Sequence, residues 1–548
     1  MTLLEFSPWA PAILVPVALI VLYTFLAAPR LKRNGIPLKT PRDSLPFVGN
    51  GIVFLQPRQK LFAWFHQRER EFGLETYQIT VPTLPPGVVI SDPVCLEYVF
   101  KNETLFNKGA FFKERSDDLF GHGIINVDGE PWRAQRKAGL NFLNTTNLRV
   151  LTDVALPRYL NENIGWLKNK ADGETVADLQ EVFHRITSQL MGKMAYNMEM
   201  HAGDDFSVAF DYASGATAER FQNPLWFITE FFTGSRLRRS LAIVKEHGRK
   251  IVANATCDRK AAEKLSATLP GVDADSEHDG LEEISGSLIQ SLLDCIGDEK
   301  LVADAALNYL SAGEMLFSCS KTRTYPLTAI HQQRNSWIAN QFAGRDTVAQ
   351  ALTWTSYLLM QHPEAIERIR AETAELISPM DGSAGNHTTL LKPPSAPYTM
   401  AVFYETMRFY PPIPFEIKQC VRETTLPDGT FLPASSVVVW CPWAMNRSKA
   451  IWGSDVDEFR PERWLSLDGK SFASRSAAEY PVFNGGARMC LGKKMADIIA
   501  VQVLPSIVTN FDFRPAYEKQ QERVSKSSLT LPMQDGLPVF VKRRDVAR

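Results

Sequence analysis

Hydrophobic positions along most of the chain recur every three or four residues, the spacing of amphipathic helices. This pattern predicts long helices over 58–72, 150–168, 179–198, 236–266 and 347–377. Strand-like segments are short and lie at 76–79, 87–90, 437–440 and 539–541. Strands and helices do not alternate regularly, so a doubly wound parallel sheet is not expected. The pattern therefore predicts a mainly α body with a small β part.

An uncharged, strongly apolar run lies near the N-terminus. No residue in 6–29 is charged, and a helix of about 20 apolar residues spans the hydrocarbon core of a bilayer. Basic residues follow within 30–33, and the positive-inside rule places what comes after them in the cytosol. A cleaved signal peptide is the alternative, but its first region should be basic, whereas the only early charge here is Glu5. We therefore expect residues 1–29 to form a single membrane anchor.

A proline-rich stretch separates this run from the rest of the chain. It contains Pro37, Pro41 and Pro46, and proline fixes φ and resists helix formation. We therefore expect 30–50 to be a stiff linker that orients the body against the membrane. The remainder, 51–548, shows no internal repeat and no clean domain linker, which predicts one large domain.

Composition and charge narrow the class of protein. Hydrophobic residues make up 45% and charged residues 22% of the chain, which excludes a mostly disordered protein and a polytopic membrane protein. Lys and Arg number 60 against 61 Asp and Glu, so there is no basic excess with which to hold nucleic acid. The 7 cysteines are odd in number and form no Cys-x-x-Cys pair, which argues against a disulfide framework or a zinc cluster. A single cysteine ligand stays open.

The most informative pattern surrounds Cys490. The stretch 483–492 reads Phe-Asn-Gly-Gly-Ala-Arg-Met-Cys-Leu-Gly, and a helix-like run, 493–504, follows it. Glycines let the backbone approach a flat cofactor, and N–H groups at a helix N-terminus stabilise a thiolate. Arg488 adds a positive charge suited to an anionic group of such a cofactor. A lone cysteine is usually a buried apolar residue, but this combination favours a thiolate ligand.

The spacing Phe483-x-x-Gly486-x-Arg488-x-Cys490-x-Gly492 resembles the haem-thiolate loop of the cytochrome P450 family. Three further family landmarks occur in the family's order: Trp132-x-x-x-Arg136, Asp346-Thr347 after an Ala-Gly pair, and Glu405-x-x-Arg408 with Arg463 downstream. Each is weak alone, because such pairs are common on helix faces and at helix caps. Together they extend over roughly 35–540. The resemblance implies the cytochrome P450 fold, preceded here by one transmembrane helix.

The resemblance also implies a cofactor, haem b, with Cys490 as the axial ligand of its iron. Three residues would shape the loop that receives it: Phe483, Gly486 and Gly492. Three more would bind or flank its propionates: Trp132, Arg136 and Arg488.

The remaining landmarks are implied to act in catalysis and in structure. Asp346 and Thr347 are the implied catalytic pair, which relays protons to reduced oxygen. A structural network behind the haem is implied for Glu405, Arg408 and Arg463.

The implied activity is a monooxygenase that inserts one atom of O2 into a C–H bond while the other leaves as water. Electrons would come from NADPH through NADPH–cytochrome P450 reductase. With the anchor, the resemblance implies a single-pass protein of the endoplasmic reticulum membrane whose catalytic domain, 51–548, faces the cytosol. The other expected partners are the lipid bilayer and a lipophilic substrate, with no nucleic acid.

Aromatic and aliphatic residues gather where the family places its substrate pocket, in 111–125, 221–232 and 413–417. Core packing is the better explanation of any one of them, but together with the anchor they favour a lipophilic substrate that enters from the bilayer. Two stretches, 343–347 and 121–132, resemble the alkane and fatty-acid ω-hydroxylase branch of fungi and plants. That similarity favours long-chain terminal hydroxylation, with fungal secondary-metabolite biosynthesis as a close second. His122 is expected to be structural, because the thiolate already fills the ligand role.

One segment departs from the family pattern. The helix that carries Asp346 should run uninterrupted, but 314–344 has poor helical periodicity and contains Pro326, which would break a helix interior. The segment follows Ala312-Gly313 and ends in a second Ala-Gly pair, so its deletion restores a continuous family helix. We hypothesise that it is a retained in-frame intron, with a genuine inserted loop as the alternative.

Two other functions stay open at this point. A genuine insert would interrupt the oxygen-side helix, and the chain would then be a haem-binding but catalytically inactive protein. A haem-dependent isomerase or dehydratase of the same fold usually lacks the acid–threonine pair, so Asp346 and Thr347 argue against it.

Overall fold

The computed structural model describes residues 15–19, 22, 30–45, 48–81, 84–196, 205–268, 288–310, 343–377, 391–518 and 522–544. Its α-helices are α2 Gly51–Phe54, α3 Arg58–Phe72, α4 Pro93–Lys101, α5 Gly109–Phe120, α6 Gly129–Phe142, α7 Thr145–Val150, α8 Leu156–Asp172, α9 Leu179–Tyr196, α10 Asp205–Gln222, α11 Trp226–Thr233, α12 Ser235–Thr268, α13 Leu288–Ile296, α14 Glu299–Leu310, α16 Ala343–Leu359, α17 Pro363–Leu376, α18 Pro397–Phe409, α19 Pro442–Met445, α20 Lys449–Trp452 and α21 Lys493–Asn510. Shorter helical turns are η1 Leu151–Ala155, η4 Pro393–Ser395, η5 Pro461–Trp464, η6 Pro481–Phe483 and η7 Gly486–Arg488. The strands are β1 Lys32–Arg33, β2 Ile36–Pro37, β3 Tyr77–Ile79, β4 Gly87–Val89, β5 Phe106–Asn107, β6 Ala177–Asp178, β7 Glu416–Cys420, β8 Thr424–Thr425, β9 Thr430–Leu432, β10 Val437–Trp440, β11 Phe511–Pro515 and β12 Pro538–Arg543.

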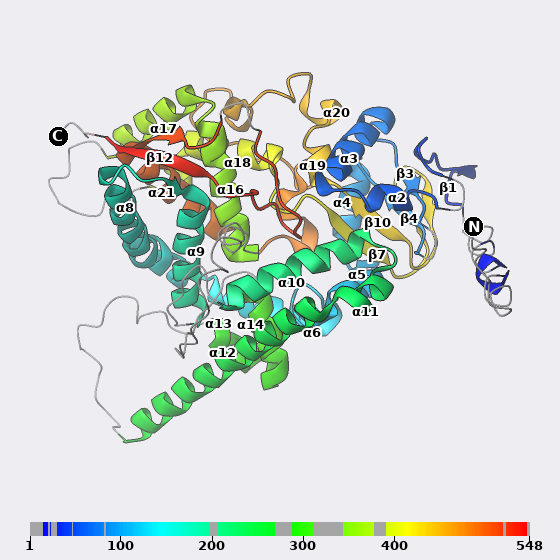
Figure 1. Ribbon diagram of the computed structural model, residues 1–548, viewed down its shortest axis with the longest axis horizontal. Helices are drawn as coiled ribbons and strands as arrows, with labels where there is room; N and C mark the ends of the chain where they lie inside the picture. The colour runs from blue at the N-terminus through cyan, green and yellow to red at the C-terminus, as the bar shows by residue number, and fades with distance from the viewer. Residues whose placement is uncertain are drawn as a thin grey trace, which may run out of the picture.

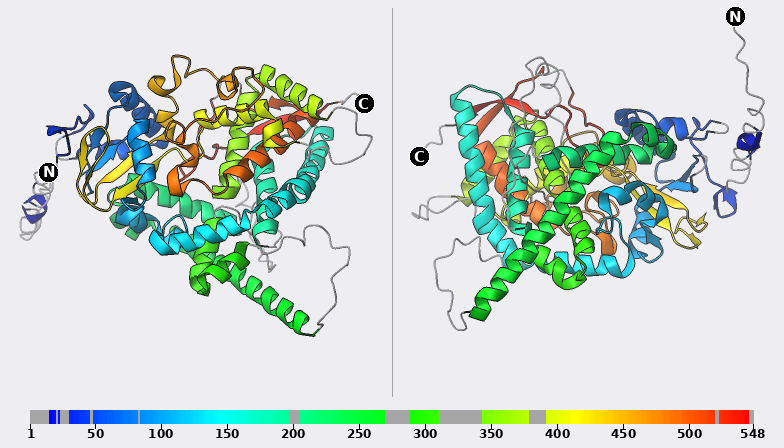
Figure 2. Two further views of the ribbon diagram at one scale, coloured as in Figure 1. Left: turned by 180° about the vertical axis from the view of Figure 1, so that it is seen from behind. Right: turned by 60° about the horizontal axis from the view of Figure 1, so that its bottom comes forward.

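The strands form small sheets at two ends of a helical body. A five-stranded sheet has the order β3-β4-β10-β7-β5, in which β4 and β10 run parallel and the other neighbours antiparallel. It lies at one end of the molecule with β1, whereas the sheet β11-β12-β6 lies at the other end (Figure 1). The two further views show the same separation (Figure 2). The architecture confirms the predicted mainly α class with a small β part.

Helix α16 lies inside the helical body, where it contacts α9, α18 and α21. Trp354 is 1% exposed and donates a 2.9 Å hydrogen bond from Nε1 to the carbonyl oxygen of Leu531. Its ring stacks on that of Tyr410 with a centroid distance of 4.0 Å. Aromatic burial and a satisfied indole N–H therefore fix this helix against the C-terminal part of the chain.

The single helix predicted over 347–377 is in fact two helices. α16 ends at Leu359, and α17 begins at Pro363 after a turn. Proline has no N–H to continue the hydrogen bonding of α16, but it suits the first position of a new helix. The periodic hydrophobic pattern continues across the break because both helices bury one face.

Part of the predicted linker 30–50 belongs to the body. β1 pairs antiparallel with β9 in the sheet β2-β1-β9-β8. Leu31 and Leu38 are 1% and 8% exposed and lie in the same hydrophobic cluster as Val438 and Trp440. The pairing is non-local, so a local reading of proline content missed it.

The predicted membrane anchor and the predicted insert lie mostly outside the residues that the structure describes. Of the predicted anchor 1–29, only 15–19 and 22 are described, and of the segment 314–344 only the last two residues are. Across the described ranges, none of the helices is both long and apolar enough to span a bilayer.

Candidate functional site

The loop of Cys490 is held in a fixed shape between η7 and α21. The N–H of Cys490 donates a 2.8 Å hydrogen bond to the carbonyl oxygen of Phe483. Gly486 has φ +61°, and a Cβ at this position would overlap the carbonyl oxygen of Phe100 on α4. The loop therefore needs glycine here, both for its backbone conformation and for its close approach to α4.

Cys490 is an exposed residue, yet protein atoms lie densely around its thiol. This burial raises the pKa of the thiol, while the N–H groups of Gly492 and Lys493 and the charge of Arg136 oppose the rise. Gly492 is the N-cap of α21, so the helix directs its first N–H groups toward the sulfur. A thiolate is consequently favoured only with a cation close to it, as on a metal.

Helix α6 brings Trp132 and Arg136 to this loop. Arg136 Nη1 donates a 3.0 Å hydrogen bond to the carbonyl oxygen of Met489, next to Cys490. The guanidinium of Arg488 lies 4.1 Å from the centroid of the Trp132 ring, and that of Arg136 lies 5.5 Å from it. Arg488 also pairs with Asp128 at 2.8 Å. Two cations thus enclose one indole beside the cysteine.

Lys418 on β7 joins this group, and the sequence reasoning missed it. It is 3% exposed, and its Nζ has no hydrogen-bond partner within the described ranges. Burial, together with the charges of Lys108 and Arg488, lowers its pKa to about 8. A lysine within a buried strand is a sequence feature that could have drawn attention to Lys418. Its position beside the site depends on the pairing of β7 with β10, which the sequence does not show. A buried lysine without a partner calls for an anion.

These residues fit the haem that the resemblance implies. One soft thiol suits an iron atom, and Trp132 offers a flat apolar surface. Arg136, Arg488 and Lys418 supply three positive charges against the two negative charges of Asp128 and Glu103, which pair with Arg488 at 2.8 and 3.6 Å. The positive excess suits the propionates of a haem. Phe483 and Gly486 shape the loop, and a Cβ at Gly492 would lie 3.9 Å from the sulfur of Cys490, so glycine keeps that space open.

The predicted catalytic pair lies on α16. Asp346 is fully buried, and its Oδ1 lies 3.5 Å from Nδ1 of His184 on α9, which is itself 2% exposed. Thr347 is half-buried at the next position. The structure thus brings Asp346 to a histidine that the sequence pattern did not single out.

Glu405 is the centre of a separate buried network. Its two oxygens accept 2.9 Å hydrogen bonds from Nη2 and Nε of Arg408 on α18 and from Nε of Arg463 on η5. Trp464 Nε1 donates to it as well, at 2.9 Å. Arg408 extends the network to the carbonyl oxygens of Asn446 and Val456, both at 2.8 Å. A buried ion pair is stable only with such complete hydrogen bonding.

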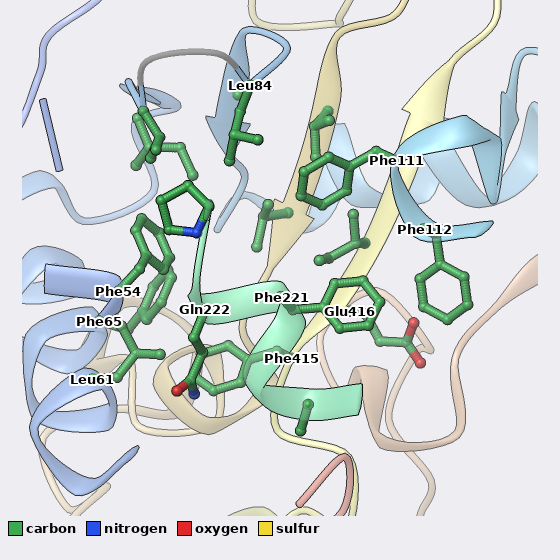
Figure 3. A pocket seen from close by; sticks show the side chains of 18 of the residues that line it. Phe54, Leu61, Phe65, Leu84, Phe111, Phe112, Phe221, Gln222, Phe415 and Glu416 are labelled. Carbon is green, nitrogen blue, oxygen red and sulfur yellow. The ribbon is translucent and has the colours of Figure 1, made fainter. Parts of the chain in front are cut away.

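A largely apolar pocket of about 170 Å³ lies between α3, the five-stranded sheet, α5 and the end of α10. Phe54, Leu61 and Phe65 lie on one side of it, and Phe112 and Glu416 lie on the other (Figure 3). The predicted substrate segments contribute Phe111, Phe112, Phe221, Phe415 and Ile417. Leu119 and Phe120 instead belong to the helical core.

His122, expected to be structural, lies outside the Cys490 loop. Its Nδ1 is 3.2 Å from Oδ2 of Asp304 on α14, and its side chain is 62% exposed. The neighbouring N–H of Ile125 donates to Asn308 Oδ1 at 3.1 Å, so α14 holds the loop between α5 and α6.

Comparison with known proteins gives the same picture. The family model described as "Cytochrome P450" matches residues 329–538. The chain is 27% identical over 520 residues to "Cytochrome P450 94A1" of Vicia sativa, covering 92% of this chain and 90% of that protein. It is 29% identical over 494 residues to "Cytochrome P450 94C1" of Arabidopsis thaliana, covering 88% and 89%.

A fungal protein is also similar. "Cytochrome P450 monooxygenase cyp1" of Mycosarcoma maydis is 29% identical over 493 residues, covering 87% of this chain and 69% of its own length. The chain is thus similar to cytochrome P450s along most of its length, and members of that family bind haem through a cysteine thiolate to iron.

Proposed function

We propose that this chain is a membrane-anchored monooxygenase that holds its haem through Cys490 and oxidises a C–H bond of a lipophilic substrate. The observation that carries the proposal is the meeting of one accessible thiol with three cations from separate elements. Arg136 comes from α6, Arg488 from the cysteine loop and Lys418 from β7. Sequence proximity alone does not assemble them.

Each of these residues has a definite task. Haem bound here supplies the activation of dioxygen and the transfer of one oxygen atom to carbon. Cys490 provides the thiolate ligand, and the N–H groups of Gly492 and Lys493 favour its charged form. Arg136, Arg488 and Lys418 balance the two propionates, and Trp132 keeps the guanidinium groups in place.

Asp346 and Thr347 are the proposed proton carriers. The Asp346 carboxyl exchanges a proton on the side that faces α9, where His184 lies 3.5 Å away. The Thr347 hydroxyl, at the adjacent position, passes the proton toward the oxygen side. The burial of Asp346 keeps this route separate from bulk water.

The test is a carbon monoxide difference spectrum of the reduced full chain in microsomes. We expect the red-shifted Soret band of a thiolate-bound haem. Cys490→Ser should abolish it, whereas Cys257→Ser, at an exposed cysteine, should retain it. A normal band in Cys490→Ser would contradict the assignment. NADPH-dependent turnover with added reductase then separates a monooxygenase from an inactive haem protein.

Membrane attachment is supported by an exposed apolar surface on α11. Phe231 and Phe232 are 76% and 77% exposed, and Phe227 is 59% exposed. Figure 1 shows α11 at the same end of the molecule as β1, where the proposed anchor joins the body. We therefore propose an endoplasmic reticulum protein with its catalytic domain in the cytosol, supplied with electrons by NADPH–cytochrome P450 reductase. A chain without residues 1–29 should keep some membrane binding. In that shortened chain, the double variant Phe231→Glu with Phe232→Glu should abolish the remaining membrane binding.

The pocket supports a lipophilic substrate, because aromatic and aliphatic side chains form most of its wall. Long-chain terminal hydroxylation is the favoured reaction, and oxidation in fungal secondary-metabolite biosynthesis is the second. Turnover of a panel of long-chain acids, alkanes and polycyclic compounds distinguishes them.

The active form is either the full 548-residue chain or a shorter chain that lacks the segment 314–344. Tryptic peptides of native protein give the answer. A peptide that joins 301–313 to Arg345 supports a retained intron, whereas Asn335–Arg345 as a peptide supports a genuine insert. A chain that keeps the insert, loads haem and shows no turnover would support the inactive alternative.

A further inference from the structure

The N-terminal half of α12 carries an exposed and strongly basic face. Its exposed basic side chains between 235 and 250 are Arg236, Arg238, Arg239, Lys245, Arg249 and Lys250. Glu246 is the single acidic residue in this range, and it pairs with Arg249. A helical face with such an excess of positive charge attracts a negatively charged surface.

The arginines near the start of α12 keep their charge unbalanced. Arg238 and Arg239 form no ion pair with any residue that the structure describes. Arg239 Nε donates a 3.4 Å hydrogen bond to the carbonyl oxygen of Ser235, one turn back on the same helix. Glu230, the acidic residue that precedes them in the sequence, is bound to Arg220 at 2.6 Å. The two guanidinium groups are therefore available to an anionic partner.

An apolar surface lies directly before this basic one. Helix α11 has no buried residue, and its exposed rings at 231 and 232 are joined by Ile228, which is 48% exposed. Phe227 and Phe231 lie four residues apart, as do Ile228 and Phe232, so these side chains share one side of the helix. Gly234 alone separates the end of α11 from the start of α12, and the two helices meet there (Figure 1). The rings and the arginines are therefore neighbours.

These two surfaces together match the interface of an anionic membrane. Aromatic rings enter the boundary between headgroups and acyl chains, while long basic side chains remain at the level of the headgroups. An uncharged apolar partner would leave Arg238 and Arg239 without a counter-charge, and a soluble anion would leave Phe231 and Phe232 in water. A lipid surface with negative headgroups satisfies both groups.

We propose that Arg238 and Arg239 bind the negatively charged headgroups of anionic phospholipids and so hold the exposed rings of α11 in the membrane. This inference rests on the proposed membrane attachment and adds the class of lipid that it uses. The charge of the lipid then decides how firmly α11 lies on the bilayer.

The experiment measures the reactivity of single arginines in the full chain, inserted in lipid nanodiscs, by phenylglyoxal labelling and mass spectrometry. One disc contains phosphatidylcholine alone, and the other contains phosphatidylcholine with phosphatidylserine. Arg238 and Arg239 should react about fivefold more slowly in the anionic disc, the shift that one basic residue gains near such a surface. Raised salt should restore their rate. Arg259, an exposed arginine in the C-terminal part of α12, should react equally in both discs.

Three results of this labelling would overturn the proposal. The first is an equal rate of Arg238 and Arg239 in the two discs. The second is an equal slowing of Arg259, because that reflects exclusion of the reagent from a charged disc. The third is protection by added reductase without any effect of lipid charge, which would assign the surface to a protein partner.

A pair of variants tests whether the arginines hold α11. In anionic discs, Arg238→Gln with Arg239→Gln should speed amide hydrogen exchange across 226–233, because α11 then lies less firmly on the lipid. Both side chains are exposed, so their replacement leaves the packed core intact. Arg249→Gln, at an arginine that already pairs with Glu246, is the matched control and should keep the wild-type rate. Equal exchange rates in the two variants would contradict the proposal.

The outcomes separate the inference from the proposed function. The reduced carbon monoxide band of the same discs reports haem binding. Lipid-dependent labelling without that band supports the inference and counts against the haem function. A normal band with labelling that is insensitive to lipid charge overturns the inference and leaves the haem function standing. A chain that enters neither disc overturns the proposed anchor together with the inference.

Discussion

Tyr404 donates a 2.9 Å hydrogen bond to Oδ1 of Asp497 and so joins the helix of Glu405 to the helix that follows Cys490. Both partners are buried, and burial raises the pKa of the Asp497 carboxyl. The ring of Tyr404 also lies 5.4 Å from that of Trp464, which itself donates to Glu405. The Glu405 network and the ligand loop are therefore mechanically one unit.

Tyr404→Phe removes only the hydroxyl of this link. We expect a loss of about 1–3 kcal/mol, because Asp497 keeps its burial and loses a donor. Thermal unfolding and haem content report it together. Tyr98→Phe is the matched control, since its 3.0 Å bond to Thr424 is only part-buried and lies outside the network. Equal effects of the two variants would contradict the link.

Gly486→Ala should prevent normal haem loading. Alanine at this position must adopt an unfavourable positive φ, and its Cβ overlaps the backbone of Phe100. Gly469→Ala separates these causes, because Gly469 has φ +71° with nothing near its Cβ position. We expect the control to lose about 1 kcal/mol of stability and to load haem normally. Haem loading in Gly486→Ala at the control's level would refute the steric argument.

Lys418→Met tests the cation that the structure adds to the site. Removing a buried charge should leave the apoprotein as stable as before or more stable. Loss of a propionate partner should speed haem transfer to apomyoglobin on the order of tenfold. Lys449→Met, at an exposed lysine of α20, is expected to change neither quantity. Unchanged haem transfer in Lys418→Met would show that Lys418 does not face a propionate.

Arg220→Gln should loosen the elements around the pocket. Arg220 is 3% exposed and pairs with Asp118 on α5 at 2.7 Å and with Glu230 on α11 at 2.6 Å. The pairing holds the pKa of Asp118 below its usual range. We expect faster ligand exchange, and a stability loss below the roughly 3–5 kcal/mol of a fully buried pair, because both carboxylates are part-exposed. Arg249→Gln, in an exposed helical pair, should be nearly silent.

His247 should make the protein acid-sensitive. Burial and the charge of Lys250 lower its pKa to about 4. An unfolded histidine titrates near about 6.5, so the unfolded chain takes up a proton first as the pH falls. Stability should therefore decline from about pH 6.5 toward pH 4, with a slope approaching roughly 1.4 kcal/mol per pH unit. The measurement is the free energy of unfolding at a series of pH values. His247→Gln should remove this pH dependence, and His122→Gln, at an exposed histidine, should leave it unchanged.

Local patterns predicted the elements that depend on local physics. The periodic run 58–72 is α3, and the run after Cys490 is α21, because an apolar face and an N-terminal glycine are visible in the sequence. The cysteine loop was likewise readable, since its glycines and its arginine lie within ten residues of the thiol.

Residues whose roles depend on distant partners were not readable. Lys418 reaches the site through the pairing of β7 with β10. His184 meets Asp346 only because α9 crosses α16. In each case the side chain looks like an ordinary helix or strand residue until the chain is folded.

The pairing of β1 with β9 limits the length of the connection between the proposed membrane anchor and the body. If 1–29 spans the bilayer as we propose, only residues 30 and 31 separate it from a strand that is hydrogen-bonded into the body. Two extended residues reach roughly 7 Å. The catalytic domain can then neither drift away from the membrane nor turn over freely beneath it. The short connection would then hold the exposed aromatic rings of α11 close to the lipid surface. Their effective concentration at the membrane would be high even if their own affinity for lipid is weak.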